Sequence, residues 1–298
     1  MPESRVLVVG ATGQLGGVIA RKLLAKGVPV RALGRTRQKL DVLAKEGAEI
    51  AAVDLLDLAR LTDACRGIGQ IVATANNNMG KGPTSPRRVD LNGYQNLCAA
   101  ARNTGVRRIV YVSYHGATPD APVDIFRLKW HIEDAIRRSL VPYVILRPTA
   151  FMETWIDGLM AAGIRKNRVT QIFGDGTALS NYIAVDDVAD VAVNVLAREE
   201  VVKEVIDFGG PSNVSLNDLA TLVEKRLGVP SKRRHVPVIA MKLHPLVKPF
   251  NEVAARLMSI GLYAATEARP FPDGPRAAGR FGVTPRTVEE HVASRLTP

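Results

Sequence analysis

The stretch RVLVVGATGQLG, at positions 5–16, decides the fold class of this chain. Its first five residues form a β-branched, apolar run, which predicts a buried strand, and glycines follow at positions 10, 13 and 16. Apolar residues then recur at helical spacing up to Gly27. A strand–glycine loop–helix unit brings backbone N–H groups close to a pyrophosphate at the positive end of the helix. We therefore expect this loop to bind a dinucleotide through Gly10, Thr12, Gly13, Gln14, Leu15 and Gly16.

Strand and helix patterns alternate from this unit as far as Pro148. The sequence predicts strands at 28–33, 48–53, 70–75, 108–113 and 143–148, and helices at 37–46, 58–65, 89–103 and 125–139. This alternation predicts an α/β fold, a doubly wound parallel sheet of the Rossmann type, over residues 1–148. We expect residues 149–298 to form a smaller C-terminal substrate lobe, interleaved with the sheet domain and not folding alone. In that lobe we expect a break at 230–237 and irregular structure at 269–282.

The end of the second predicted strand selects the cofactor. A site for NAD places Asp or Glu there to accept a hydrogen bond from the ribose, whereas this chain has Gly34 followed by Arg35, Arg37 and Lys39. Guanidinium groups can hold a 2′-phosphate through paired hydrogen bonds, so we expect NADP rather than NAD. At the end of the third predicted strand we expect Asp54 and Leu55 to contact the adenine. At the end of the fourth we expect Thr74, Ala75 and Asn76 to contact the inner ribose. Asp54 could equally cap the following helix.

Composition and charge narrow the class of partner. The net charge is +11, and residues 4–40 contain eight Lys and Arg residues but no Asp or Glu. Because this basic stretch coincides with the glycine loop, a phosphorylated cofactor accounts for much of it, and we do not expect nucleic acid as a partner. The chain has only two cysteines, no metal-ligand spacing, no signal-peptide pattern and no apolar stretch of the ~20 residues that a membrane span needs. We expect a cytoplasmic protein with no metal and no membrane partner.

Taken together, these motifs resemble the NmrA-like group of atypical short-chain dehydrogenases. The resemblance rests on GATGQLG at 10–16, ALGR at 32–35, VDLNGYQNL at 89–97, RRIVYVS at 107–113, FRLKWHIE at 126–133, VILRPTAFME at 144–153 and YIAVDDVAD at 182–190. It implies NADPH binding. It also implies either reduction of carbonyls, quinones or activated double bonds, or sensing of the nucleotide's redox state without catalysis.

The chain departs from the usual catalytic set of short-chain dehydrogenases at one position. The resemblance places Lys129 at the lysine of the Tyr-x-x-x-Lys motif, where it would hold ribose hydroxyls with a lowered pKa, but Ile125 stands at the tyrosine. Ser113, Tyr114 and His115, just after the fifth strand, are candidates for the missing proton donor. We expect Pro148 and Phe151 to line the nicotinamide face. An exposed helix position for Lys129 is the competing interpretation, and we expect Glu133 on a solvated helix face.

Two functions are consistent with these residues. One is an NADPH-dependent oxidoreductase that reduces a small apolar carbonyl, quinone or enone, with the apolar segment 238–264 as a pocket wall. The other is a non-catalytic NADP(H) sensor or assembly factor that acts through a protein partner, which Ile125 favours.

Overall fold

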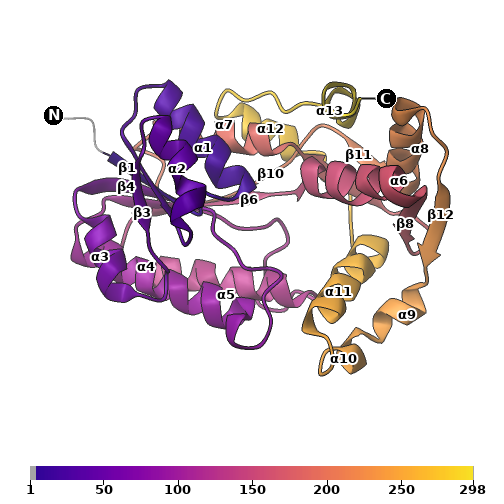
Figure 1. Cartoon of the computed structure of the whole chain (residues 1–298), viewed down its shortest axis with the longest axis horizontal. Helices are drawn as coiled ribbons and strands as arrows, with labels where there is room; N and C mark the ends of the chain where they lie inside the picture. The colour runs from indigo at the N-terminus through magenta and orange to yellow at the C-terminus, as the bar shows by residue number, and fades with distance from the viewer. Residues whose placement is uncertain (1–4, 298) are drawn as a thin grey trace. The chain divides into compact units, whose positions relative to one another are not determined.

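The computed structural model describes residues 5–297 and contains a seven-stranded sheet (Figure 1). The strands lie in the order β10-β6-β5-β4-β1-β2-β3, and every pair whose register is described is parallel. The strands are β1 (Arg5–Val9), β2 (Val30–Gly34), β3 (Glu49–Ala52), β4 (Ile68–Ala73), β5 (Arg108–Val112), β6 (Tyr143–Pro148) and β10 (Glu204–Phe208). The predicted doubly wound α/β fold is confirmed.

Helices cover both faces of this sheet. Figure 1 shows α1 (Gln14–Ala25) and α2 (Arg37–Lys45) on one face, and α3 (Leu58–Cys65), α4 (Asn92–Asn103) and α5 (Asp124–Arg138) on the other. Two short segments, the 3₁₀ turn η1 (Gly82–Thr84) and the π-helical turn η2 (Arg87–Leu91), precede α4. The helices predicted from the sequence around α2, α3, α4 and α5 are therefore present. The bounds of α3 are as predicted, and those of the other three differ by one to three residues.

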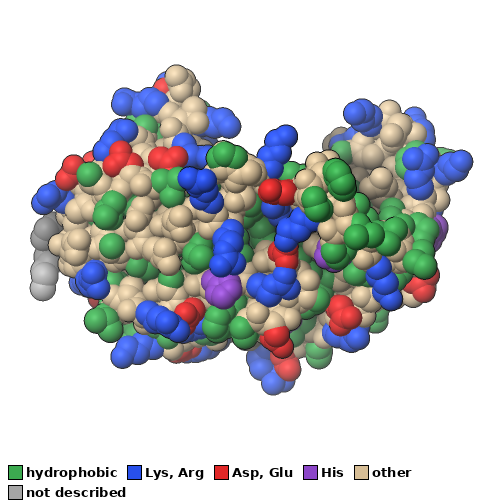
Figure 2. All heavy atoms as spheres, turned by 90° about the horizontal axis from the view of Figure 1, so that it is seen from below, with side chains coloured by type: hydrophobic (Ala, Val, Ile, Leu, Met, Phe, Trp, Pro, Cys, Tyr) green, Lys and Arg blue, Asp and Glu red, His purple; other side chains and the backbone are tan. Residues whose placement is uncertain are grey.

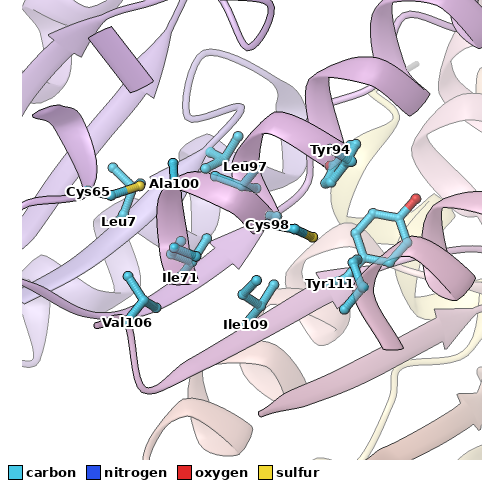
Figure 3. Packing of buried hydrophobic residues seen from close by; sticks show 14 of the residues in the cluster. Leu7, Cys65, Ile71, Tyr94, Leu97, Cys98, Ala100, Val106, Ile109 and Tyr111 are labelled. Atoms are coloured by element: carbon cyan, nitrogen blue, oxygen red, sulfur yellow. The ribbon is translucent and has the colours of Figure 1, made fainter. Parts of the chain in front are cut away.

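The core between the sheet and α3–α5 is made by side chains that alternate along the strands. Leu7 of β1, Ile71 of β4 and Ile109 of β5 are fully buried against Leu97 and Cys98 of α4 (Figure 3). Burying one such aliphatic side chain stabilises the folded state by roughly 1.5–3 kcal/mol. This packing holds each strand in register with its neighbours, and the register determines where each strand ends relative to the next.

Those ends matter because the strand order reverses at β1. Chain order continues from β1 to β2 on one side, whereas β4 pairs with β1 on the other side. In open parallel sheets a crevice forms at such a reversal, outside the carboxyl ends of the strands. The glycine loop follows β1 directly and therefore lies at this position.

Arg108, the first residue of β5, ties the end of a distant helix to the sheet. Its guanidinium is buried and donates to the Gln70 side chain and to the backbone oxygens of Val195, Leu196, Arg198 and Val201 at 2.6–3.0 Å. These oxygens lie at and just after the end of α7 (Val185–Leu196). A cation near a helix C-terminus interacts favourably with the helix dipole, and this one satisfies orphan carbonyls as well.

The chain divides into two compact units. The first contains residues 1–120, 125–147 and 188–206, and the second contains 121–124, 148–187 and 207–298. One of the boundaries between the units lies between residues 147 and 148. Residues 188–206, which the sequence placed in the C-terminal lobe, instead pack with the first unit, because the Arg108 contacts hold the end of α7 there.

The second unit contains the shorter elements. They are β7 (Ala150–Phe151), η3 (Glu153–Ala161), α6 (Ala162–Asn167), β8 (Val169–Phe173), β9 (Leu179–Ile183), β11 (Asn213–Ser215), α8 (Leu216–Leu227), β12 (Lys232–Val236), α9 (Val238–Lys242), α10 (His244–Val247), α11 (Glu252–Thr266), α12 (Gly274–Gly279) and α13 (Val288–Arg295). The predicted break at 230–237 is wrong, because β12 pairs there with β8 in parallel. The predicted irregular stretch at 269–282 contains α12.

Candidate active site

Glycine stands at three positions of the loop after β1 for three different reasons. Gly10 has φ +85°, and a Cβ built on it would lie 2.7 Å from the backbone nitrogen of Ala75, just after β4. A Cβ on Gly16 would lie 2.3 Å from the Gly10 oxygen, so this glycine lets α1 approach the loop. At Gly13 a Cβ would meet only the Gly10 oxygen, at 3.2 Å. Gly10 and Gly16 therefore close the loop, while Gly13 keeps its outer side open.

The helix that begins at this loop has an uncapped N-terminus. Gly13 is the N-cap of α1, no side chain accepts a hydrogen bond from the first turn, and that turn has no acidic residue. Thr12, Gly13 and Gln14 are exposed, whereas Leu15 and Gly16 are buried. An open glycine in front of unoccupied N–H donors fits a pyrophosphate, because both the donors and the helix dipole favour an anion there.

The turn after β2 excludes an acidic side chain where an NAD site carries one. A Cβ on Gly34 would lie 2.9 Å from the Thr12 methyl group, so the glycine loop itself fills that position. Arg35, Arg37 and Lys39 follow and are all exposed. Arg37 forms an ion pair with Asp41 at 3.3 Å. Within residues 5–297 no ion pair holds Arg35, so its guanidinium is available to an incoming phosphate.

The other residues expected around the nucleotide lie at the ends of β3 and β4. Asp54 is exposed, and its carboxylate accepts from the Leu56 N–H at 2.9 Å. The alternative that Asp54 caps the next helix is wrong, because Asp57 is the N-cap of α3. The Leu55 oxygen accepts from Asn96. Beyond β4, the Thr74 hydroxyl donates to the Val9 oxygen at 3.1 Å, Ala75 lies against Gly10, and Asn76 is exposed.

Lys129 is not an exposed helix lysine. It lies on the inner face of α5 with 2% of its surface exposed, and its ammonium lies 4.7 Å from the ring centre of Tyr114 and 5.1 Å from that of Tyr111. Desolvation by burial lowers the pKa of Lys129 to about 8, against the opposing effect of the Asp90 and Glu133 carboxylates. The ammonium thus stays largely charged at neutral pH but is close enough to its pKa to release a proton.

Tyr114 is oriented by a residue that sequence reasoning did not single out. The Asn78 amide donates to the Tyr114 hydroxyl at 2.6 Å. This leaves the hydroxyl's own proton for another acceptor. Desolvation raises the pKa of Tyr114, although the hydrogen bond from Asn78 acts in the opposite direction. Asn78 lies in the polar loop after β4. Its position shortly after the end of that strand is the only feature of the sequence that points to it.

Ser113 is turned away from this group. It is fully buried, and its hydroxyl donates to the Glu133 carboxylate at 2.6 Å. Glu133 is also fully buried and accepts from Arg137 at 2.8 Å and from Arg147 at 2.6 Å. The expected solvated position of Glu133 is therefore wrong: this carboxylate joins α5 to β5 and β6. Ser113 accordingly has a hydrogen-bonding partner within the fold.

The remaining candidates lie apart along the chain. His115 is half-buried in the loop after β5, and Ile125, at the position of the absent tyrosine, is buried in the first turn of α5. Pro148 is buried at the end of β6 and Phe151 is half-buried in β7, both in the second unit. Their contact with the nicotinamide stays a prediction. Among residues 5–297, no group of His, Cys, Asp and Glu side chains could hold a metal ion, and no helix is long and apolar enough to cross a membrane.

Comparison with proteins of known sequence gives relatives of several kinds. The chain is 30% identical to a (4-alkanoyl-5-oxo-2,5-dihydrofuran-3-yl)methyl phosphate reductase of Streptomyces griseus, over 82% of this chain and 81% of that protein. It is 28% identical to the photosystem II assembly factor Ycf39 of Cyanophora paradoxa, over 80% and 73%. It is also 28% identical to the chloroplastic protein High Chlorophyll Fluorescence Phenotype 244 of Arabidopsis thaliana, where it spans 64% of that protein's length.

Comparison with solved structures agrees with the fold. An NADPH-dependent quinone oxidoreductase of Escherichia coli, complexed with NADPH, superposes with a TM-score of 0.80 at 23% identity, over 97% of this chain and 99% of the other. Residues 10–199, which contain the glycine loop, the basic turn and Lys129, match the family described as NAD(P)H-binding. The loop, the uncapped helix and the sheet reversal are what such a family requires, and the chain belongs to this NAD(P)H-binding family.

Proposed function

We propose that this chain is an NADPH-dependent reductase of a small apolar carbonyl, quinone or enone. The observation that carries the proposal is the buried Lys129 beside Tyr114, in the same compact unit as the glycine loop. Burying an ammonium costs free energy, and a lysine that acts on a substrate oxygen benefits from such a desolvated position. The similarity to a reductase of Streptomyces griseus and to a quinone oxidoreductase fold supports this class of reaction.

NADPH is the proposed cofactor because of the turn after β2. Gly34 supplies no ribose-binding carboxylate, and Arg35, which no ion pair holds within residues 5–297, offers its guanidinium to a 2′-phosphate. When bound, the cofactor supplies the hydride. The chain's own residues must then hold the substrate carbonyl, stabilise the negative charge that develops on its oxygen, and deliver a proton to that oxygen.

Two side chains meet these requirements. The Lys129 ammonium provides charge stabilisation in a desolvated position, where an electrostatic interaction is stronger than in water. Tyr114 is the proposed proton donor: its oxygen already accepts from Asn78, so its proton can pass to the substrate. The tyrosinate left behind would be stabilised by Asn78 and by the nearby charge of Lys129. Tyr114 would then serve in place of the tyrosine that Ile125 replaces.

The test is NADPH oxidation with a panel of quinones, enones and aldehydes. For an active wild type we expect Lys129→Met and Tyr114→Phe each to lower the turnover rate by ~10²-fold or more, with only modest effects on NADPH binding. The exposed Lys45→Met serves as a matched control and should leave the rate unchanged. Full activity in both variants would remove these two residues from the mechanism and turn attention to His115.

The second candidate function is a non-catalytic NADP(H) sensor or assembly factor. It is favoured by the buried Ile125 at the tyrosine position and by the similarity to an assembly factor of photosystem II. A wild type that binds NADPH tightly but oxidises it with no member of the panel would support this function over the reductase.

A further inference from the structure

The segment 238–250 exposes four large hydrophobic side chains. The exposed fractions are 76% for Ile239, 51% for Leu243, 69% for Leu246 and 92% for Phe250. They follow one another at intervals of four, three and four residues, which is the spacing of one helix face. We call these four residues the apolar face. They lie on α9, on α10 and in the turns that follow each of these helices.

This exposure is not a result of loose packing. Both α9 and α10 pack against α11, and Met241, on the inner side of α9, is only 1% exposed. A Cβ on Gly261 of α11 would lie 3.0 Å from the Met241 sulfur, so the two helices are in close contact. The apolar face is therefore held outward by a packed inner side. Large apolar side chains that gather on a folded surface mark an interaction site.

Positive charge accompanies the apolar face. Residues 232–251 contain five Lys and Arg residues and no Asp or Glu. Arg233 pairs with Glu224 and Lys248 with Asp124, but within the described part of the chain no ion pair holds Lys232, Arg234 or Lys242. Figure 2 shows hydrophobic side chains gathered over this part of the second unit, with Lys and Arg around them. An anionic partner would complement this charge.

The composition of the segment indicates which anionic partner it fits. Residues 236–250, VPVIAMKLHPLVKPF, contain only apolar residues, proline, lysine and histidine. The hydrogen-bonding side chains of this segment are Lys242, His244 and Lys248, so it has none of the amide or hydroxyl groups that a protein interface carries in its polar rim. A second copy on a two-fold axis would bring basic residues against basic residues, which is unfavourable. Apolar side chains bordered by lysines are what a bilayer surface with anionic lipids binds.

We propose that α9, α10 and the turn to Phe250 dock the protein on the surface of an anionic bilayer. Phe250 and Leu246, which are 92% and 69% exposed, enter the boundary between headgroups and acyl chains. Lys242 and its neighbouring cations contact the lipid phosphates. This contact is peripheral, so it requires no membrane-spanning helix. It is also independent of catalysis.

The experiment is flotation of the full chain with vesicles of phosphatidylcholine alone and of phosphatidylcholine with phosphatidylglycerol. We expect binding to the vesicles with phosphatidylglycerol that is about tenfold tighter than to phosphatidylcholine and that weakens as salt is raised. The double variant Leu246→Ser/Phe250→Ser should lose about tenfold or more of that binding. Both side chains are largely exposed, so the variant should fold normally.

Two controls separate this contact from general stickiness. Leu140, 84% exposed in the first unit, is changed in Leu140→Ser and should leave vesicle binding unchanged. Lys242→Glu should weaken binding to the anionic vesicles, whereas Lys45→Glu should have a much smaller effect. The proposal is overturned if the wild type binds neither kind of vesicle, if the double variant binds as well as the wild type, or if the apolar face is buried in a dimer in solution.

Discussion

Arg35 and Arg37 lie two residues apart in the turn after β2 but differ in their partners. Arg37 is paired with Asp41, whereas no ion pair within residues 5–297 holds Arg35. We expect Arg35→Ala to weaken NADPH binding by ~1.5–3 kcal/mol, the scale of a charge-assisted hydrogen bond, and to leave NADH binding nearly unchanged. Arg37→Ala should have a smaller effect. Calorimetry with both cofactors measures this, and equal affinity of the wild type for NADPH and NADH would contradict the proposed preference.

Substitutions at two glycines of the loop after β1 should affect different properties, one the binding of the dinucleotide and the other the stability of the fold. Gly13→Val places a side chain where the loop is open, so dinucleotide binding should be lost while stability falls by only about 1 kcal/mol, the scale of an N-cap change. Gly16→Ala drives a methyl group into the Gly10 oxygen and should instead lower the free energy of unfolding by about 1–3 kcal/mol. Urea unfolding and calorimetry on both variants check the contrast. Normal NADPH binding by a folded Gly13→Val protein would show that the pyrophosphate lies elsewhere.

The lowered pKa of Lys129 makes stability depend on pH in a defined window. Its pKa is about 8 in the folded chain, below the ordinary value of 10.5, so the unfolded chain binds more protons between these two values. The free energy of unfolding of the cofactor-free wild type should therefore rise with pH, by about 2 kcal/mol between about pH 8 and 9.5, relative to Lys129→Met. Denaturation of both proteins across this window measures the difference. Parallel pH profiles would show that the lysine is solvated.

On α5, two acidic neighbours have very different roles. Glu133 is fully buried and joins the helix to β5 through Ser113 and to β6 through Arg147. Because Glu133→Ala would leave that arginine, 15% exposed, without its carboxylate, we expect a loss of about 2–4 kcal/mol in the free energy of unfolding. Asp134→Ala removes only an ion pair with the exposed Arg138 and should cost about 0.5 kcal/mol or less. Similar losses in both variants would mean that Glu133 does not join these elements.

Elements with a strong local pattern could be predicted from the sequence. The strand at 143–148 and the helix at 58–65 have the predicted bounds, because apolar periodicity and turn residues coincide there. The strand β12 was missed because its residues, KRRHV, are charged and lie between prolines; only pairing with β8 makes them a strand. The helix α13 did carry a signal, since Thr287 and Glu290 form a capping box.

The candidate site was predictable to a similar extent. The glycine loop and the basic turn are local motifs that follow β1 and β2, two neighbouring strands of the sheet. The position of Lys129 followed from a resemblance, but its burial and its two aromatic neighbours depend on β5 and α5 packing together. Asn78 and Glu133 were missed for the same reason. The Tyr114 partner of Asn78 is 36 residues away in the chain, and of the partners of Glu133 only Arg137 lies at helical spacing, whereas Arg147 and Ser113 are 14 and 20 residues away.

At the scale of the whole chain, the two kinds of basic surface have separate explanations. The basic stretch before residue 40 belongs to the first unit and surrounds the dinucleotide loop, whereas the basic segment after residue 231 belongs to the second unit and accompanies the apolar face. Residues 4–40 and 232–251 together carry thirteen Lys and Arg residues and no Asp or Glu, so the rest of the chain is close to neutral and these two stretches account for the net charge of +11.

The Arg108 contacts bear on the order in which the chain folds as it is synthesised. This guanidinium is buried by β5, but four of its acceptors belong to residues 195–201, almost ninety residues later. When the nascent chain has left the ribosome only as far as β6, the Arg108 cation does not yet have these acceptors. Burying the cation in that state is strongly unfavourable. The sheet therefore closes only after α7 has emerged. Until then the apolar strands that precede α7 in the chain lack their final packing.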